Sequence, residues 1–248
     1  MSDAIQRKRR QMSIWVRITD FVSATAIPAF SAVIEAVRTL FEGDPETRRR
    51  VAFSVAMIAL SAKMAKADGV VMQSEVDAFK EIFDIPEEHA DQVSMLYNLA
   101  KQDVAGFDSY AAQLANLCSS QEGENCPILR DIIDGLFHIA KADNLLHSNE
   151  LAFLQEVAAI FSISDAEFDR ILSRHVDKGA SDPYRILGLK PGVEYSDARA
   201  VYMDLVREHH PDNFLARGLP MEFMKISTDR MAAINDAWHS VEADLKRL

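Results

Sequence analysis

The sequence has few of the residues that interrupt helices or cross-link small folds. Its 248 residues include only 9 glycines, 8 prolines and 2 cysteines. The scarcity of glycine and proline between long apolar runs favours helix throughout. Cys118 and Cys126 have no His or Cys neighbours in a zinc spacing, which argues against a zinc site. We expect both to be buried thiols in a reducing compartment, with one disulfide as the alternative.

The sequence also has no clear membrane-spanning segment near its start. Residues 21–34, "FVSATAIPAFSAVI", form an uncharged run of 14 residues between Asp20 and Glu35. A spanning helix needs about 20 such residues. Arg17 and Asp20 interrupt what would be the apolar part of a signal peptide. We therefore expect residues 12–42 to form a helix that packs on the body of the protein, with contact to a membrane surface as the alternative.

Positive charge is scarce in the middle of the chain. The net charge is −11, and residues 61–181 hold 9 Lys and Arg against 21 Asp and Glu, a net of −12. Nucleic-acid binding draws its affinity from phosphate neutralisation, so this balance argues against a nucleic-acid partner. The basic cluster at residues 7–10 is the place from which attraction to a membrane would come. We expect a cytoplasmic protein, with peripheral contact at the inner membrane as the alternative.

A repeat with an offset of 75 residues organises the first 180 residues. "AKADGVVMQSEVDAFKEIF" at 65–83 and "AKADNLLHSNELAFLQEVAAIF" at 140–161 begin with the same four residues. Each copy includes the end of a long apolar helix, predicted at 51–67 and 128–142. Self-similarity at a fixed distance indicates one structural unit used twice. We expect two helical hairpins that face each other and bury both apolar helices in one core.

Further helices are predicted around the second copy of the repeat. The stretch between the copies predicts helices at 86–102 and 107–119. "SDAE" at 164–167 is a capping box, in which Ser164 and Glu167 reciprocally satisfy backbone amides. Another helix should therefore begin there.

Two pairs of acids occupy equivalent positions in the repeat. Asp68 and Glu75 in the first copy correspond to Asp143 and Glu150 in the second. "DGVVMQSE" is like the second half of an EF-hand loop, but a lysine and a methionine stand where calcium needs oxygen ligands. We favour a structural role, with each Asp bonding turn amides and each Glu near a helix N-terminus. The alternative is a shared divalent-cation site, which would be the one cofactor of the protein.

The repeated motif, "AKADG…E" and then "AKADN…E", resembles the TerB-like all-helical domain associated with tellurite-resistance proteins. The resemblance covers residues 48–175. Asn144 replaces the glycine of the pattern, which fits because Asn also adopts left-handed conformations. This resemblance implies an architecture rather than an activity.

The last seventy residues predict a separate unit of three helices after a short linker. Asp182 caps a short first helix, Ser196 caps an amphipathic second one, and Pro220 begins a third. The third helix is long enough to lie antiparallel to the second. The expected core residues are Tyr184, Leu187, Tyr202, Leu205, Ile234 and Trp238.

The junction between the second and third helices carries "VREHHPDN" at residues 206–213. Pro211 ends the second helix, so a stiff loop presents His210, Pro211 and Asp212 outward. A metal site would need a clear third ligand, and a catalytic dyad would need a nucleophile or a substrate pocket. A loop that contacts another protein needs only what is present. We expect His209 to be half-buried against the third helix.

"DPYRILGL", a helix ending in "REHHPDN" and a long helix with "AAINDAW" together resemble the J domain of DnaJ-type co-chaperones over residues 182–248. With the insert "FLARGLP" and the preceding TerB-like domain, the chain resembles the DjlA-type branch. In that family the His-Pro-Asp loop engages a DnaK-type chaperone and stimulates its ATP hydrolysis. The chaperone-binding residues that the resemblance implies are His210, Pro211, Asp212, Asn213, Arg207 and Arg199.

The sequence departs from this family in three respects. Met203 and Asp204 stand where the family commonly has a basic pair, so electrostatic steering should be weaker. The glycine/phenylalanine-rich and zinc-binding client regions of the family are absent from the sequence. Residues 21–34 are too short to be a clear form of the N-terminal membrane anchor of the DjlA type.

The sequence thus predicts an all-α protein with an N-terminal extension (1–47), a TerB-like bundle with an internal two-fold repeat (48–178) and a small J-domain helical hairpin (179–248). The expected function is a co-chaperone and not an enzyme, because the sequence shows no nucleophile–base pair and no cofactor loop. It also lacks a phosphate loop, so ATP hydrolysis would be the chemistry of the partner. Its partners would be a DnaK-type chaperone and a client protein, with the TerB-like domain setting client or location. The alternative is a metal- or stress-sensing scaffold that uses the paired acids.

Overall fold

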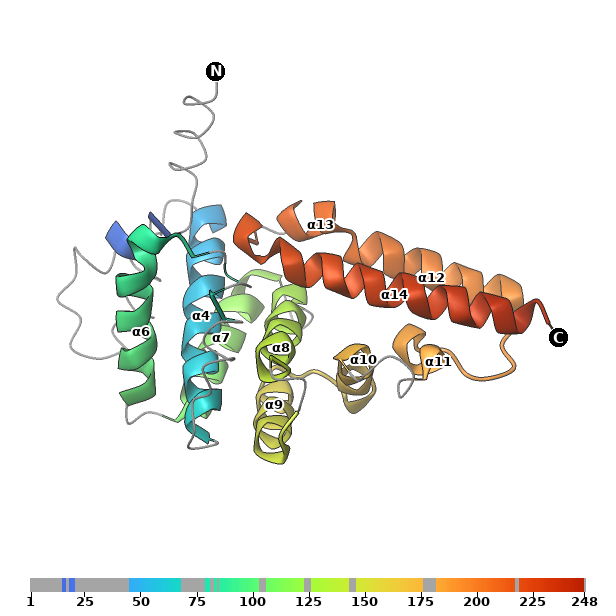
Figure 1. Cartoon of the computed structure of the whole chain (residues 1–248), viewed down its shortest axis with the longest axis horizontal. Helices are drawn as coiled ribbons and strands as arrows, with labels where there is room; N and C mark the ends of the chain where they lie inside the picture. Colours follow the sequence, from blue (N-terminus) through green and yellow to red (C-terminus); the bar gives the residue numbers. More distant parts are fainter. Residues whose placement is uncertain are drawn as a thin grey trace, which may run out of the picture.

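The computed structural model describes residues 15–16, 18–20, 45–67, 79–80, 83, 85–102, 106–122, 126–142, 146–175, 182–216 and 219–247. Within these ranges all regular secondary structure is helical and no strand occurs, so the predicted all-α class is confirmed. Figure 1 shows a group of helices on one side and a long helix pair extending away from it on the other.

The group of helices, which we call the bundle, is built around α4. Its members are α4 (Pro45–Ala67), α6 (Ala90–Gln102), α7 (Phe107–Glu122), α8 (Pro127–Ala140), α9 (Ser148–Ile160) and α10 (Asp165–His175). Helix α4 contacts α6, α7, α8 and α9. Residues 51–65 of α4 are buried except for half-buried Ala52, as expected for a helix that is apolar on every side. The amine of Lys63 lies 5.3 Å from the centre of the Tyr110 ring.

The two apolar helices of the predicted repeat, α4 and α8, pack against each other, as two hairpins with one core require. In the first copy Phe79 and Phe83 are buried, and in the second copy Leu154 is buried. The turn of the first copy lies outside the described residues. The two-fold repeat itself therefore stays a prediction.

Part of the predicted N-terminal helix packs on the bundle. Of residues 12–42 the structure describes 15–16 and 18–20, which are helical. Trp15 and Ile18 are fully buried in the bundle core, and the indole N–H of Trp15 donates to the carbonyl of Phe83 at 3.1 Å. No described helix combines the length and the apolar character that crossing a membrane requires.

The expectation of a free thiol was wrong for Cys126. This residue directly precedes α8, is buried, and is disulfide-bonded. The alternative of one disulfide is what the structure has. A disulfide depends on how close the fold brings two cysteines, which composition and compartment do not determine.

Helix ends follow the sequence in most places. The amide of Glu167 donates to the hydroxyl of Ser164 at 3.3 Å, and the amide of Tyr184 donates to Asp182 at 2.9 Å. Gly188 ends α11 (Pro183–Leu187) with φ of 70°, a left-handed conformation that favours glycine.

Two predicted helix starts differ from the structure. Helix α12 (Tyr195–His209) begins one residue before Ser196, and Glu194 is its N-cap residue without a side-chain capping bond. After Pro220 a short 3-10 helix, η2 (Met221–Phe223), precedes α14 (Met224–Leu245). The extra turn allows Phe223 to reach the bundle core before the long helix begins.

The long pair, which we call the hairpin, consists of α12 and α14. The hydroxyl of Tyr195 donates to Glu242 at 2.8 Å near one end, and the hydroxyl of Ser227 donates to the carbonyl of His209 at 3.5 Å near the other. The first contact joins the start of α12 to the end of α14, and the second joins the end of α12 to the start of α14. The two helices are therefore antiparallel, as predicted. Between them the Tyr202 and Trp238 rings are stacked with centroids 4.7 Å apart.

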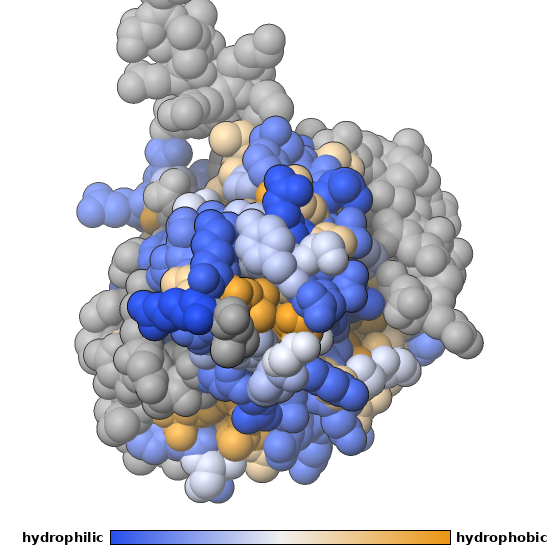
Figure 2. Space-filling view, turned by 90° about the vertical axis from the view of Figure 1, so that its right-hand side faces the viewer, coloured by the Kyte–Doolittle hydropathy of each residue, from blue (hydrophilic) through white to orange (hydrophobic). Residues whose placement is uncertain are grey.

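The hairpin has a core of its own, to which α11 contributes. Ile186, Leu187, Ala198, Leu205, Ile234, Ala237, Trp238 and Val241 form it. Of the six expected core residues, Tyr184 and Tyr202 are half-buried and the other four are buried. Viewed from the hairpin end in Figure 2, the described surface is largely hydrophilic, and hydrophobic atoms appear in the spaces between polar ones.

The segment between α12 and α14 contributes buried side chains to the core of the bundle. We call residues 210–216 and 219–223 the tip; it contains α13 (Pro211–Ala216) and η2. Phe214 and Phe223 are fully buried in the bundle core. The Phe223 ring lies edge-on to Phe53 and Phe83, with centroid distances of 4.6 and 4.5 Å. The sequence-based boundary at residues 178/179 stays a prediction, but the two parts share hydrophobic contacts.

Candidate protein-contact site at the His-Pro-Asp loop

The loop is shaped by one proline. Helix α12 ends at His209, and His210 is extended, with φ of −58° and ψ of 137°. Pro211 disfavours a helical conformation in the preceding residue and lacks the N–H that would continue α12. The same residue begins α13, where a missing N–H costs little. Pro211 thus separates two helices without an intervening flexible segment.

Short-range hydrogen bonds hold the backbone of the loop. The carbonyl of His210 accepts from the amides of Asn213 at 2.9 Å and Phe214 at 3.3 Å. The amide of Asp212 donates to Nδ1 of His210 at 3.2 Å, and the side-chain amide of Asn213 donates to the carbonyl of Arg207. The imidazole of His210 is therefore turned towards the start of α13.

The predicted contact residues lie on the surface. The side chain of His210 is 52% exposed and that of Asp212 is 87% exposed, while Pro211 is half-buried. Arg199, Arg207 and Asn213 are also exposed. Arg207 pairs with Asp204 at 2.8 Å on the same helix, a contact that adds little stability because both groups are solvated. Their role in binding stays a prediction.

The residues on either side of the loop are anchored. Phe214 is fully buried, and His209 is buried rather than half-buried. Nδ1 of His209 lies 3.3 Å from Nη1 of Arg230 in α14. Since a guanidinium can only donate, Nδ1 of His209 is the acceptor. The exposed triplet is therefore held between two interior residues.

Arg230 joins the hairpin to the bundle. Its Nη1 lies 2.6 Å from Oδ1 of Asp131, and its Nε lies 2.7 Å from Oδ2 of Asp134, both in α8. Oδ1 of Asp134 also contacts Arg174 at 3.3 Å and His175 at 2.8 Å. We call these five residues the Arg230 cluster. Every side chain in it is at most 9% exposed.

The protonation states in the cluster follow from burial and neighbouring charge. Burial alone raises the pKa of the Asp134 carboxyl, but Arg230, Arg174 and His175 outweigh it and hold this pKa well below its ordinary value. Burial lowers the pKa of His175 to about 4, against the opposing effect of Asp134. His175 is therefore neutral at pH 7. Two carboxylates then balance two guanidiniums, as a buried group of charges requires.

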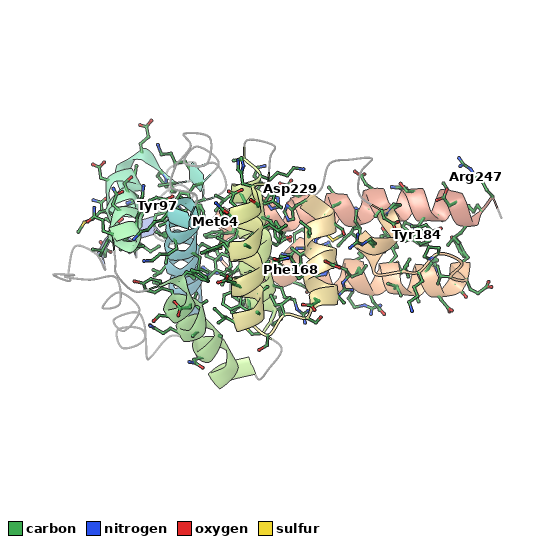
Figure 3. The ribbon with its side chains drawn as sticks, turned by 90° about the horizontal axis from the view of Figure 1, so that it is seen from below. Met64, Tyr97, Phe168, Tyr184, Asp229 and Arg247 are labelled. Atoms are coloured by element: carbon green, nitrogen blue, oxygen red, sulfur yellow. The ribbon has the colours of Figure 1, made fainter. Side chains whose placement is uncertain are left out.

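A second polar contact joins α8 to α14 beside this cluster. Nε2 of His138 lies 3.3 Å from Asp229, and its Nδ1 lies 3.0 Å from the carbonyl of Asp134. Both partners are acceptors, so these two contacts favour the form in which both ring nitrogens carry a proton. Although burial opposes it, Asp229 and Asp134 raise the pKa of His138. Figure 3 shows Asp229 beside the bundle.

Sequence reasoning missed the Arg230 cluster, although a signal was present. Asp131 and Asp134 lie in "ILRDIIDGLF", where the neighbouring residues are largely apolar. Arg230 lies at helical spacing between buried Ser227 and Ile234. Charged residues at core positions indicate a buried ion pair, but the sequence does not say which charges meet.

The predicted cation site receives no support from the described residues. Within the part of the chain that the structure covers, no three His, Cys, Asp or Glu side chains lie close enough to hold a metal ion. Glu150 is buried and accepts the amide of His147 at 2.9 Å, as the third residue of α9. This is the structural role expected for the acid. Asp68, Glu75 and Asp143 lie outside the described residues, so the cation site stays a prediction.

Comparison with known proteins agrees with this architecture. Residues 54–173 match the family model of the tellurite resistance protein TerB. These residues, which include α6 to α9 and most of α4 and α10, are a TerB domain, so the chain is an all-α, TerB-containing protein.

Curated relatives match a larger part of the chain. It is 23% identical to the co-chaperone protein DjlA of Photobacterium profundum, over 79% of each chain. It is also 23% identical to the DjlA of Escherichia coli K12, over 79% of this chain and 81% of the relative, and 24% identical to that of Coxiella burnetii, over 72% of each. The chain therefore resembles the DjlA-type co-chaperones. No solved structure matches it.

Proposed function

We propose that the chain is a co-chaperone that contacts a DnaK-type chaperone through its His-Pro-Asp loop and stimulates ATP hydrolysis by that partner. The relatives carry the name co-chaperone. The observation that carries the proposal is the exposure of His210 and Asp212 on a backbone held between buried His209 and buried Phe214. Ordering such a segment on binding costs little conformational entropy.

The loop rather than long-range charge would provide most of the recognition. Helix α12 exposes Arg199 and Arg207, but Asp204 neutralises Arg207 across 2.8 Å. The association rate should therefore be modest and only weakly sensitive to salt. The exposed imidazole and carboxylate supply hydrogen bonds of defined direction, while the chemistry of ATP hydrolysis belongs to the chaperone.

The ATPase rate of a purified DnaK-type chaperone tests this function. We expect the intact chain to raise the single-turnover rate, and His210→Gln to reduce the stimulation by about tenfold or more, because it removes an exposed contact of the loop. His239→Gln, an exposed histidine on α14, is the matched control and should stimulate like the wild type. Equal stimulation by the wild type and His210→Gln would contradict the proposal.

We further propose that the TerB domain selects the client or the location of the protein. The support is that the domain exposes residues of α6 and α9, which are not part of the loop. Crosslinking of the intact chain in cells of its source, followed by identification of the crosslinked residues, tests this role. Client crosslinks should fall on the bundle; crosslinks confined to the hairpin would contradict it.

A further inference from the structure

The His-Pro-Asp loop is attached to the TerB domain from both sides. Before the loop, His209 contacts Arg230, which is paired with two carboxylates of α8. After the loop, Phe214 lies in the core of the bundle. We propose that the TerB domain positions the His-Pro-Asp loop, with Arg230 as the positioning residue that links Asp131 and Asp134 to His209. This inference rests on the proposed function of the loop.

The geometry of Arg230 suits this role. Its Nε faces Asp134, and its Nη1 faces both Asp131 and Nδ1 of His209, at 2.7, 2.6 and 3.3 Å. A guanidinium is planar, so the two carboxylates together set the direction in which the third contact points. The ring of His209 is thereby oriented by residues almost 80 positions earlier in the chain. A lysine, with one point charge, cannot hold three such partners in one plane.

The orientation of His209 reaches the exposed residues directly. Ser227, one turn before Arg230, donates to the carbonyl of His209 at 3.5 Å, so α14 holds both the ring and the backbone of this residue. The next peptide leads into His210, whose carbonyl accepts the amides of Asn213 and Phe214. A rotation at His209 would therefore alter the direction of the His210 imidazole and of the first turn of α13.

The contact supports the loop and does not cover it. His210 and Asp212 remain exposed while Arg230 is paired with the TerB domain. Beside the loop, Arg130 of α8 pairs with Glu208 of α12 at 3.1 Å, and both side chains are partly solvated. The arrangement thus presents the triplet outward in one geometry, which favours positioning over inhibition.

The test uses two single variants of the intact chain, Asp131→Asn and Arg230→Lys. Asp131→Asn removes one charge and leaves Asp134 with Arg230, whereas Arg230→Lys keeps the charge and removes the planar fork. Asp229→Asn is the matched control, because it weakens the neighbouring contact with His138 in α8 but has no contact with His209. Thermal unfolding establishes that each variant is folded. If one of the two test variants fails to fold, the other decides.

Two measurements separate positioning from general destabilisation. The first is the position of the backbone amide signals of Asp212 and Asn213 in NMR spectra, which needs no chaperone. We expect both test variants to shift these signals and Asp229→Asn to leave them in place. The second is chaperone ATPase as a function of co-chaperone concentration. We expect the half-maximal concentration to rise by about fivefold or more with an unchanged maximum.

The outcomes distinguish this inference from the proposed function. Unmoved Asp212 and Asn213 signals in a folded test variant would overturn the inference, and so would an equal effect of Asp229→Asn. Increased stimulation by the test variants would show an inhibitory contact and would also overturn it. If the wild type does not stimulate the chaperone at all, the proposed function fails, and the NMR shifts alone then decide whether Arg230 positions the loop.

Discussion

At the scale of single residues, two neighbouring histidines at the Arg230 cluster differ in protonation behaviour. His138 and His175 have ring centroids only 4.6 Å apart, yet their pKa values move in opposite directions. His138 faces Asp229 and a carbonyl, which favour its charged form. His175 lies beside Arg174 and stacks on Phe137, and burial keeps it neutral. Local surroundings, rather than residue type, decide the direction in which each pKa moves.

The low pKa of His175 predicts a loss of stability in mild acid. In the unfolded chain an ordinary histidine has a pKa of 6.5, whereas in the folded chain that of His175 is about 4. Below pH 6.5 the unfolded state therefore binds more protons, and stability falls until about pH 4, by about 3 kcal/mol in total.

Asp134 adds a further loss only at pH below its ordinary pKa of 3.8, because its folded pKa is lower still. His138 acts in the opposite sense, since its stabilising effect is present below pH 6.5 and is lost as the pH rises through its raised pKa.

Chemical unfolding at pH 7 and pH 5 checks this prediction. The free energy of unfolding of the wild type should fall over this range, and His175→Gln, which keeps a donor for Asp134, should reduce the fall. His239→Gln is the control, as an exposed histidine outside the cluster. A pH dependence that is the same in His175→Gln and the wild type would show that His175 is not the titrating group.

At the scale of secondary structure, α8 is the element that connects the two parts of the molecule. It packs against α4 in the bundle and against α14 in the hairpin. Gly135 is a place of tight packing, because a Cβ atom there would lie 2.8 Å from Cε of Met57 and 2.9 Å from Cδ1 of Ile226. In an exposed helix, alanine is more stabilising than glycine by about 1 kcal/mol, but at position 135 the methyl group has no room.

Substitution of Gly135 by alanine should therefore destabilise the protein. We expect Gly135→Ala to lower the free energy of unfolding by about 1–3 kcal/mol, because Met57 and Ile226 must move. Ile226→Val, which removes Cδ1, should cost less in the Gly135→Ala background than in the wild type. A double-mutant cycle from urea unfolding measures this coupling. Additive effects would show that the methyl group does not meet Ile226.

At the scale of the whole molecule, the hairpin and the bundle are joined by a shared core as well as by ion pairs. Phe223 and Phe214 of the tip are buried with Phe53 and Phe83 of the bundle. The two tryptophans of the sequence lie in different parts: Trp15 is buried in the bundle and Trp238 packs in the hairpin. Each can therefore report on its own part.

We expect the two parts to unfold together. Trp238→Phe retains Trp15 as the fluorescent probe, and Trp15→Phe retains Trp238. The urea unfolding transitions that these two variants report should coincide after correction for the stability of each variant. Phe223→Ala should lower the stability reported by both probes by about 3–5 kcal/mol, because it empties a site in the joint core. Two separate transitions in the intact chain would mean that the tip contacts do not couple the parts.

Local sequence patterns were sufficient for much of this molecule. The helices, the caps at Asp182 and Ser164, and the end of α12 at Pro211 each depend on residues within a few positions of one another. The same holds for the break in the helix at the triplet, since a proline ends α12 whatever lies further away. Family resemblance to TerB and to DjlA-type co-chaperones rests on such local motifs and was evident from the sequence for the same reason.

The tertiary structure alone decided which charges meet and where the tip lies. Arg230 and its two carboxylates are 96 and 99 positions apart, and periodicity shows only that each occupies a buried helix face. The orientation of α8 against α14 brings them together. Phe223 likewise joins the bundle core because of how the tip folds back, which no local pattern encodes. Local conformation is set by neighbours in the chain, whereas the pairing of buried groups is set by packing across the whole fold.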